Sequence, residues 1–355
     1  MFVLSNPVVA DDEHKEEKET EKQQRASSLQ GKSGKIKGAL SVLVLGSGGP
    51  VATDKGRASA GYLIFTDGKP RILMDVGGGT YQRLAESGVN IKDIDIVLLS
   101  HLHIDHTADL SAIIKTVYFH NNLARGINPN LPGRKLPINI FGPTSTSFPD
   151  GPGGKFPDTD ILQYPSTEDY VHQHYSVAKG GVERYLHAFA PAISEGASKF
   201  AYTATDLSSN WKAGIIESVF EDDDLTITAV AVNHGPVPAV GFRIDYKGNS
   251  IVYSGDTSSI TDNMIELSRD ADLLIYDTAI TNDLPLNSLF HLLHTSPTRI
   301  GQVAAEANAG KLLLSHITPV TESRMDIVIR SIRDEGYNGK IKIAKDLKVF
   351  NLDNH

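Results

Sequence analysis

The chain contains no cysteine, which excludes disulfide bonds, thiolate metal ligands and a cysteine nucleophile. It also lacks any apolar run close to the roughly 20 residues that a membrane-spanning helix needs. Positive charge is not in excess, because 34 Lys and Arg stand against 43 Asp and Glu, for a formal net charge of −9. Without an overall basic field, the chain has no general electrostatic attraction for nucleic acid. The remaining composition, with 40% hydrophobic and 22% charged residues, is ordinary for a globular protein.

The amino-terminal end differs in composition from the rest of the chain. Residues 11–25 hold seven acidic and four basic side chains, so this stretch cannot bury enough apolar surface to fold alone. Just before it, Val8 and Ala10 are arranged as in a signal-peptidase site, although the preceding apolar stretch is short. We therefore expect residues 1–38 to be a disordered tail or the remnant of a secretory signal, which slightly favours a periplasmic or secreted location. The folded domain is expected to span residues 39–355.

A dense group of metal-binding side chains occupies residues 101–106, which read His-Leu-His-Ile-Asp-His. The apolar run 94–99 before it predicts a buried strand, and residues 109–120 after it have the apolar spacing of a helix. The group is therefore expected on a strand-to-helix loop, where a rigid scaffold commonly places chemistry. This pattern is far more specific than a single histidine, and it indicates a metal site rather than solvated loop residues.

The spacing within this group suggests two metal positions. His101 and His103 are two residues apart, so on an extended backbone their side chains point the same way and can hold one ion. Asp105 and His106 follow as the loop turns, and they can offer one oxygen and one nitrogen to a second ion. Neutral imidazole and carboxylate suit zinc, or iron or manganese at the more oxygen-rich position.

The remaining pattern alternates strands and helices and predicts an α/β fold. Strands are expected at 40–45, 60–65, 71–75, 136–141, 225–233, 240–246, 250–254, 273–277 and 312–315, and helices at 80–87 and 296–308. Residues 144–215 begin with a stretch rich in Pro, Gly and Asp and carry no clear motif. We expect them to form an insertion, with a helix within 167–190 and an acidic turn following at 221–224.

Four further polar residues stand at positions typical of a functional site. His234, Asp256 and His316 each follow directly on an expected strand, as the first histidine group does. His294 lies just before the helix that Ser296 and Pro297 are expected to start, and helix-start amides favour an anion there. A histidine at this position can hold an oxyanion or protonate a leaving group. His291, three residues earlier, is expected to be an ordinary loop histidine.

The motif of residues 101–106 resembles the signature of the metallo-β-lactamase superfamily. The stretches that resemble the ribonuclease Z branch of this superfamily, which also holds arylsulfatase-like and phosphodiesterase relatives, are 220–243, 253–257, 294–304 and 314–317. The resemblance implies a four-layer αββα sandwich and a centre of two metal ions, with zinc expected. It places His101, His103 and His234 on one ion, Asp105, His106 and His316 on the other, and Asp256 between them. It also implies catalytic roles for Asp105, for His294 and for Asp277, which would orient His294.

Two departures from that branch decide the expected substrate. The branch carries a glutamate where this chain has Asp277, whose side chain is shorter. The transfer-RNA processing enzymes also carry a basic arm between the third metal motif and the Gly-Asp motif, where this chain has only Lys247-Gly248-Asn249. We therefore expect a small anionic ester, either a phosphodiester or an aryl sulfate, ahead of a large RNA, and we expect a homodimer. Ribonuclease Z-type RNA cleavage and lactone or β-lactam hydrolysis are the alternatives.

Overall fold

The computed structural model describes residues 35–89, 91–116, 137–145, 164–175, 202–285 and 287–352. Nearly all of the tail expected at 1–38 lies outside these residues. Residues 117–120 of the helix expected at 109–120 and most of the insertion expected at 144–215 lie outside them as well. Among the described residues, no helix combines the length and hydrophobicity needed to cross a membrane.

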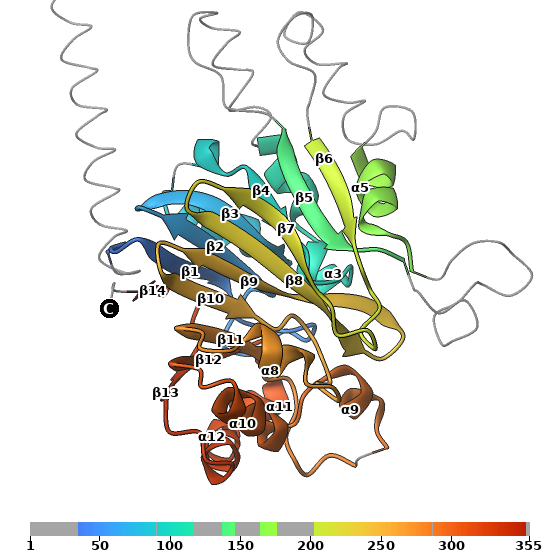
Figure 1. Ribbon diagram of the computed structural model, residues 1–355, viewed down its shortest axis with the longest axis vertical. Coiled ribbons are helices and arrows are strands. Elements are labelled where there is room, and N and C mark those ends of the chain that lie inside the picture. Colours follow the sequence, from blue (N-terminus) through green and yellow to red (C-terminus); the bar gives the residue numbers. More distant parts are fainter. Residues whose placement is uncertain are drawn as a thin grey trace, which may run out of the picture.

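Two seven-stranded sheets pack face to face (Figure 1). The first has the order β14-β1-β2-β3-β4-β5-β6, with bounds Leu40–Gly46 (β1), Gly61–Thr66 (β2), Lys69–Val76 (β3), Ile96–Leu98 (β4), Ile138–Pro143 (β5), Tyr202–Leu207 (β6) and Val349–Leu352 (β14). The second has the order β13-β12-β11-β10-β9-β8-β7, with bounds Ile216–Asp222 (β7), Leu225–His234 (β8), Val237–Tyr246 (β9), Asn249–Tyr253 (β10), Leu273–Asp277 (β11), Lys311–Ser315 (β12) and Lys340–Ile343 (β13). Both sheets mix parallel and antiparallel pairs.

Helices cover the outer face of each sheet, as Figure 1 shows for the second sheet. The helices are α2 (Thr80–Glu86), the 3-10 turn η1 (Ile91–Asp93), α3 (Ile104–Thr107), α5 (Thr167–Tyr175), α8 (Asn263–Leu267), α9 (Leu289–Leu293), α10 (Pro297–Glu306), α11 (Pro319–Glu322) and α12 (Met325–Asp334), and residues 110–116 are also helical. One apolar cluster fills the space between the sheets, a second joins the second sheet to α8, α10 and α12, and a third joins the first sheet to α2, residues 110–116 and α5. The structure is thus the expected four-layer αββα sandwich.

Strands that are covered on both faces explain why the sequence pattern located most of them. All seven residues of β1 are buried, and such strands read as continuous apolar runs. The strands that the pattern missed expose part of their length. In β6, which pairs with β5 at the edge of the first sheet, half-buried and exposed side chains alternate up to the buried Leu207, and no continuous apolar run marks the strand. Part of the expected insertion therefore belongs to the sheet, and the boundaries of that insertion stay a prediction.

The candidate site residues gather at one edge because their strands run in the same direction. Strands β8, β10, β11 and β12 share one orientation, so their carboxyl ends meet at that edge, where α/β folds usually bind ligands. Strand β4 of the first sheet leads into the histidine motif from the opposite side. The two sheets are joined there by the Val240 amide, which donates a hydrogen bond of 2.9 Å to the Ser100 carbonyl.

Close backbone approach at this edge requires glycine at position 77. A Cβ atom on Gly77 would lie 1.9 Å from the Asp105 carbonyl oxygen, whereas a Cβ atom on Gly78 would meet nothing closer than 3.9 Å. We predict that Gly77→Ala lowers the free energy of unfolding by about 1–3 kcal/mol and displaces the metal-binding loop, because overpacking forces the backbone to shift. Chemical unfolding and metal content measure this. Gly78→Ala is the matched control, and equal behaviour of the two variants would contradict the prediction.

Candidate metal centre

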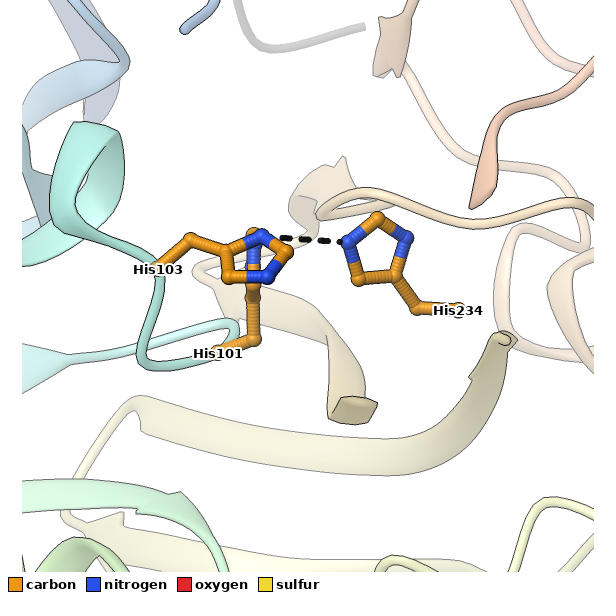
Figure 2. A group of neighbouring side chains, drawn as sticks. All are labelled: His101, His103 and His234. Carbon is orange, nitrogen blue, oxygen red and sulfur yellow. Dashed lines mark hydrogen bonds between the residues drawn. The ribbon is translucent and has the colours of Figure 1, made fainter. Parts of the chain in front are cut away.

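Three histidines from two sheets converge at the edge of the sandwich (Figure 2). His101 Nε2 lies 3.0 Å from His103 Nδ1, and His234 Nε2 lies 3.4 Å from the same atom. Nitrogen ligands around a tetrahedral zinc ion, with bonds of about 2.0–2.1 Å, are separated by roughly 3.3 Å. The three rings therefore have the spacing of one metal site. His234 is further oriented by its Nδ1, which lies 2.7 Å from the Leu293 carbonyl oxygen and leaves Nε2 for an ion.

Burial keeps these three histidines neutral. It lowers the pKa of His101 well below its usual value, lowers that of His103, and brings the pKa of His234 to about 3. Only the neutral imidazole can bind a metal, because the protonated ring has no free lone pair. The electrostatic state of the group thus suits metal binding at neutral pH.

A second group contains Asp105, His106, Asp256 and His316, all buried. His316 Nε2 lies 3.2 Å from both Asp105 Oδ2 and Asp256 Oδ2, and His106 Nε2 lies 3.3 Å from His316 Nε2. Burial lowers the pKa of both histidines, but the neighbouring carboxylates outweigh it, raising the pKa of His106 well above its usual value and that of His316 to about 10. The carboxylates therefore create a strong local demand for positive charge, which protons or metal ions can meet.

Asp256 lies between the two groups. Its Oδ2 is 3.5 Å from His106 Nε2 and 3.9 Å from His101 Nε2. Its Oδ1 is buried and has no hydrogen-bond partner among the described residues. A buried carboxylate oxygen without a partner is costly, and a cation at this position would satisfy it. The donor set and its spacing therefore fit a pair of metal ions that share Asp256.

Asp75 is a supporting residue that the sequence analysis missed. Its carboxylate accepts hydrogen bonds of 2.7 Å from the Ser100 amide, the Ser100 hydroxyl and the Tyr253 hydroxyl, and lies 2.7 Å from His106 Nδ1. A carboxylate behind a ligand histidine fixes the ring and its tautomer. The only signal in the sequence was an acidic residue directly after the apolar run 72–74 of β3, two positions before Gly77.

His294 and Asp277 form a pair beside the second group. His294 Nδ1 lies 2.8 Å from Asp277 Oδ2, and Asp277 Oδ1 lies 3.3 Å from His316 Nδ1. Burial lowers the pKa of His294, but the negative charges of Asp277 and Asp256 raise it by more. The pKa of His294 therefore lies above its usual value. His294 stands two residues before Ser296, which is the N-cap of α10 as expected. The Ser296 side chain accepts a hydrogen bond from the Arg299 amide. His291 lies in α9 and not in the expected loop. Its ring contacts the Leu284 carbonyl oxygen and joins neither group.

Known proteins resemble this chain over most of its length. A family model described as a beta-lactamase superfamily domain matches residues 159–317, and one described as the metallo-beta-lactamase superfamily matches residues 54–133. The ribonuclease Z of Mycobacterium avium (strain 104) is 26% identical over 321 residues, covering 88% of this chain and 99% of the relative. The solved structure of the metallo-beta-lactamase fold protein YhfI from Bacillus subtilis has a TM-score of 0.57 and 22% identity, covering 88% of this chain and 99% of the other. Human tRNase Z, short form, has a TM-score of 0.57 and 19% identity, covering 87% and 98%.

The chain belongs to the metallo-β-lactamase superfamily. The similarity to ribonuclease Z proteins supports the expected ribonuclease Z branch of this superfamily, and the chain is a metal-dependent hydrolase that acts on phosphodiester or other ester bonds. The expected fold and family are thereby confirmed. The structure brings together all seven expected ligands and the His294–Asp277 pair. The individual roles of these residues, the identity of the metal and the homodimer stay predictions.

We predict that the protein binds close to two metal ions per chain and that Asp256→Ala reduces binding at both positions. Removing a carboxylate that two cations share leaves both cations with too little neighbouring negative charge. His234→Ala serves as the matched comparison, because it removes a ligand from one group only and is expected to leave about one ion. Elemental analysis after dialysis measures the content. Retention of two ions by Asp256→Ala would show that Asp256 does not bridge.

Proposed function

We propose that this chain is a two-metal phosphodiesterase of the ribonuclease Z type, and that the 3′ end of an RNA is its substrate. The observation that carries the proposal is the arrangement around Asp256, which contacts both ligand groups and lies 3.9 Å from His294 Nδ1. An acid-base histidine next to two metal positions suits cleavage of an anionic ester. Hydrolysis then needs a nucleophile, charge neutralisation and a proton for the leaving oxygen.

Each ligand group has a distinct part in this proposal. His101, His103 and His234 would hold zinc as a neutral nitrogen set, and Asp105, His106 and His316 would hold zinc, iron or manganese at a more oxygen-rich position. Two bound ions would lower the pKa of a water molecule and neutralise the phosphate oxygens. Asp75 would hold His106 with its Nε2 turned towards the second ion, because its carboxylate lies 2.7 Å from Nδ1.

His294 would supply the proton to the leaving oxygen. Its Nδ1 faces Asp277, so in the neutral ring the Nδ1–H group would donate a hydrogen bond to the Asp277 carboxylate. Asp277 also raises the pKa of the ring, which allows a second proton on Nε2. A histidine protonated on Nε2 and anchored through Nδ1 is oriented to act as a general acid. The shorter side chain of Asp277 still reaches His294, since Asp277 Oδ2 lies 2.8 Å from His294 Nδ1.

Two substrate classes are consistent with this chemistry, and the comparisons rank them. The curated ribonuclease Z relatives match the chain almost from end to end, which favours RNA over the small ester that the sequence analysis placed first. The turn between β9 and β10 favours a small phosphodiester instead. It consists of Lys247 and Gly248 with positive φ angles of 48° and 76°, a tight hairpin turn where the transfer-RNA processing enzymes carry an arm. The small phosphodiester is therefore our second candidate.

Substrate panels can decide between these candidates. We predict that the metal-loaded protein cleaves a short RNA with a 3′ extension and also hydrolyses bis(4-nitrophenyl) phosphate, whereas it leaves 4-nitrophenyl sulfate nearly intact. Gel analysis of the RNA and absorbance of nitrophenolate measure this, with Asp256→Ala as the inactive control. Turnover of the small phosphodiester without RNA cleavage would select the second candidate. Turnover of the sulfate alone would contradict the phosphodiesterase assignment.

The proposed role of His294 has a distinct kinetic signature. We predict that His294→Ala keeps its metal but slows RNA cleavage by roughly 10²–10⁴-fold, the usual contribution of a positioned acid or base. The loss should be much smaller for bis(4-nitrophenyl) phosphate, because nitrophenolate leaves without protonation. His291→Ala is the matched control and should retain full activity. An equal loss on both substrates would assign His294 to holding the oxyanion instead.

A further inference from the structure

The segment that follows Asp256 contacts the chain next to three other candidate site residues. Thr257 Oγ1 and the Ser258 hydroxyl donate to the carbonyl oxygen of Asn233, which precedes His234. Ser259 Oγ lies 2.5 Å from the hydroxyl of Tyr276, which precedes Asp277. Thr295, which follows His294, donates to the Thr257 carbonyl oxygen at 2.5 Å. One short segment thus links the backbones that carry His234, Asp277 and His294 to the backbone that carries Asp256.

Ser259, Tyr276 and Thr295 form a compact hydroxyl cluster within this arrangement. All three are buried, and Thr295 Oγ1 lies 3.1 Å from Ser259 Oγ. Burial raises the pKa of Tyr276 to about 12, so its hydroxyl keeps its proton and remains available as a donor. Ser259 has a φ of 48°, which is unusual for a residue with a side chain, and the Arg299 guanidinium holds its carbonyl oxygen at 2.9 Å. Strained backbone of this kind persists only where its surroundings hold it in place.

The backbone amide of His294 donates a hydrogen bond of 2.8 Å to the Phe290 carbonyl oxygen of α9, and the position of His294 beyond this helix depends on further support. It stands between α9 and α10 with extended φ and ψ angles of −129° and 153°. Its side chain is tied to Asp277, while its backbone continues into Thr295, whose hydroxyl is bonded within the cluster. The cluster therefore holds both partners of the pair, Asp277 through Tyr276 and His294 through Thr295.

We propose that the hydroxyl cluster is a positioning device that sets the His294–Asp277 pair relative to Asp256 and the metal positions. This inference rests on the proposed function of His294 as the acid for the leaving oxygen. A proton donor must lie within hydrogen-bond reach of the oxygen it protonates, and small displacements of such a group cost large factors in rate. The cluster acts through His294 and has no role in holding the metal ions.

The test uses variants that remove one hydroxyl and keep the shape of the side chain. In the metal-loaded protein, Thr295→Val and Tyr276→Phe should each lower kcat for RNA by about 10–100-fold, the range typical of residues that orient a functional side chain. KM, metal content and turnover of bis(4-nitrophenyl) phosphate should change little. Thr295→Ser retains the hydroxyl and should restore kcat. The ratio of the rate for RNA to the rate for bis(4-nitrophenyl) phosphate is the decisive measurement, because a purely structural role of the cluster would leave this ratio unchanged.

A second readout does not depend on activity. The proton shared between His294 Nδ1 and Asp277 should give a downfield imidazole signal in NMR spectra of histidine-labelled protein. We expect this signal to shift or broaden in Thr295→Val and to remain in Thr295→Ser. Thr66→Val and Tyr337→Phe make the same chemical changes at buried positions outside the site, and both should leave the signal and the rate ratio unchanged.

The outcomes separate this inference from the proposed function. If the wild-type protein hydrolyses no phosphodiester, the proposed function fails, and an unchanged imidazole signal in Thr295→Val then overturns the positioning role as well. If His294→Ala shows the leaving-group dependence but both cluster variants behave as wild type, only the positioning role is overturned. Equal losses on both substrates accompanied by loss of metal would assign the cluster to general stability and also overturn it.

Discussion

Buried negative charge is the constraint on which the rest of the structure depends. Asp75, Asp105, Asp256 and Asp277 are all buried at one edge of the sandwich, within reach of the same few histidines. Burying an ionised carboxylate costs several kcal/mol unless a positive charge or hydrogen bonds compensate it. Asp75 is compensated by four neighbouring donors, whereas Asp256 keeps one oxygen without a partner. The fold thus concentrates an unfavourable charge at the place where cations can make it favourable.

The two sheets must approach each other closely to create this concentration, and small residues make the approach possible. A Cβ atom on Gly49, which follows β1, would lie 2.8 Å from the ring of His316, which follows β12 of the second sheet. On the side of the first sheet, Gly77 leaves room for the Asp105 carbonyl oxygen. Gly255, with a φ of 57°, lies against Ser100 of the opposite sheet. The hydrogen bond from Tyr253 to Asp75 and that from Tyr62 to Ser315 cross the sandwich directly beneath the candidate metal positions. The same contacts therefore pack the two sheets together and set the geometry of the candidate site.

The chemistry and the choice of substrate are located in different parts of the fold. Strand ends and short loops hold the candidate ligand groups and the His294–Asp277 pair. A tight turn joins β9 and β10, at the position where the resemblance in the sequence implies an arm in the transfer-RNA processing enzymes. A change in that turn alters the surface available to a large substrate and leaves the centre unchanged. This separation is common where loops on a rigid scaffold carry specificity.

Local patterns were sufficient for much of the fold and for most of the candidate ligands. Residues 101–106 were recognised because their spacing acts over a few residues, and the buried strands were recognised as apolar runs. The start of α10 could also be predicted from neighbouring residues, because the Ser296 side chain caps the helix that begins directly after it. Asp75, the hydroxyl cluster and the edge strand β6 could not be recognised in this way. Their roles depend on contacts between residues 17 to 178 positions apart, such as Ser259 with Tyr276 and Tyr253 with Asp75. These contacts exist only once strand order and sheet packing are established. Sequence spacing specifies which side chains can bind a metal, whereas the sandwich decides which of them meet and what holds them in place.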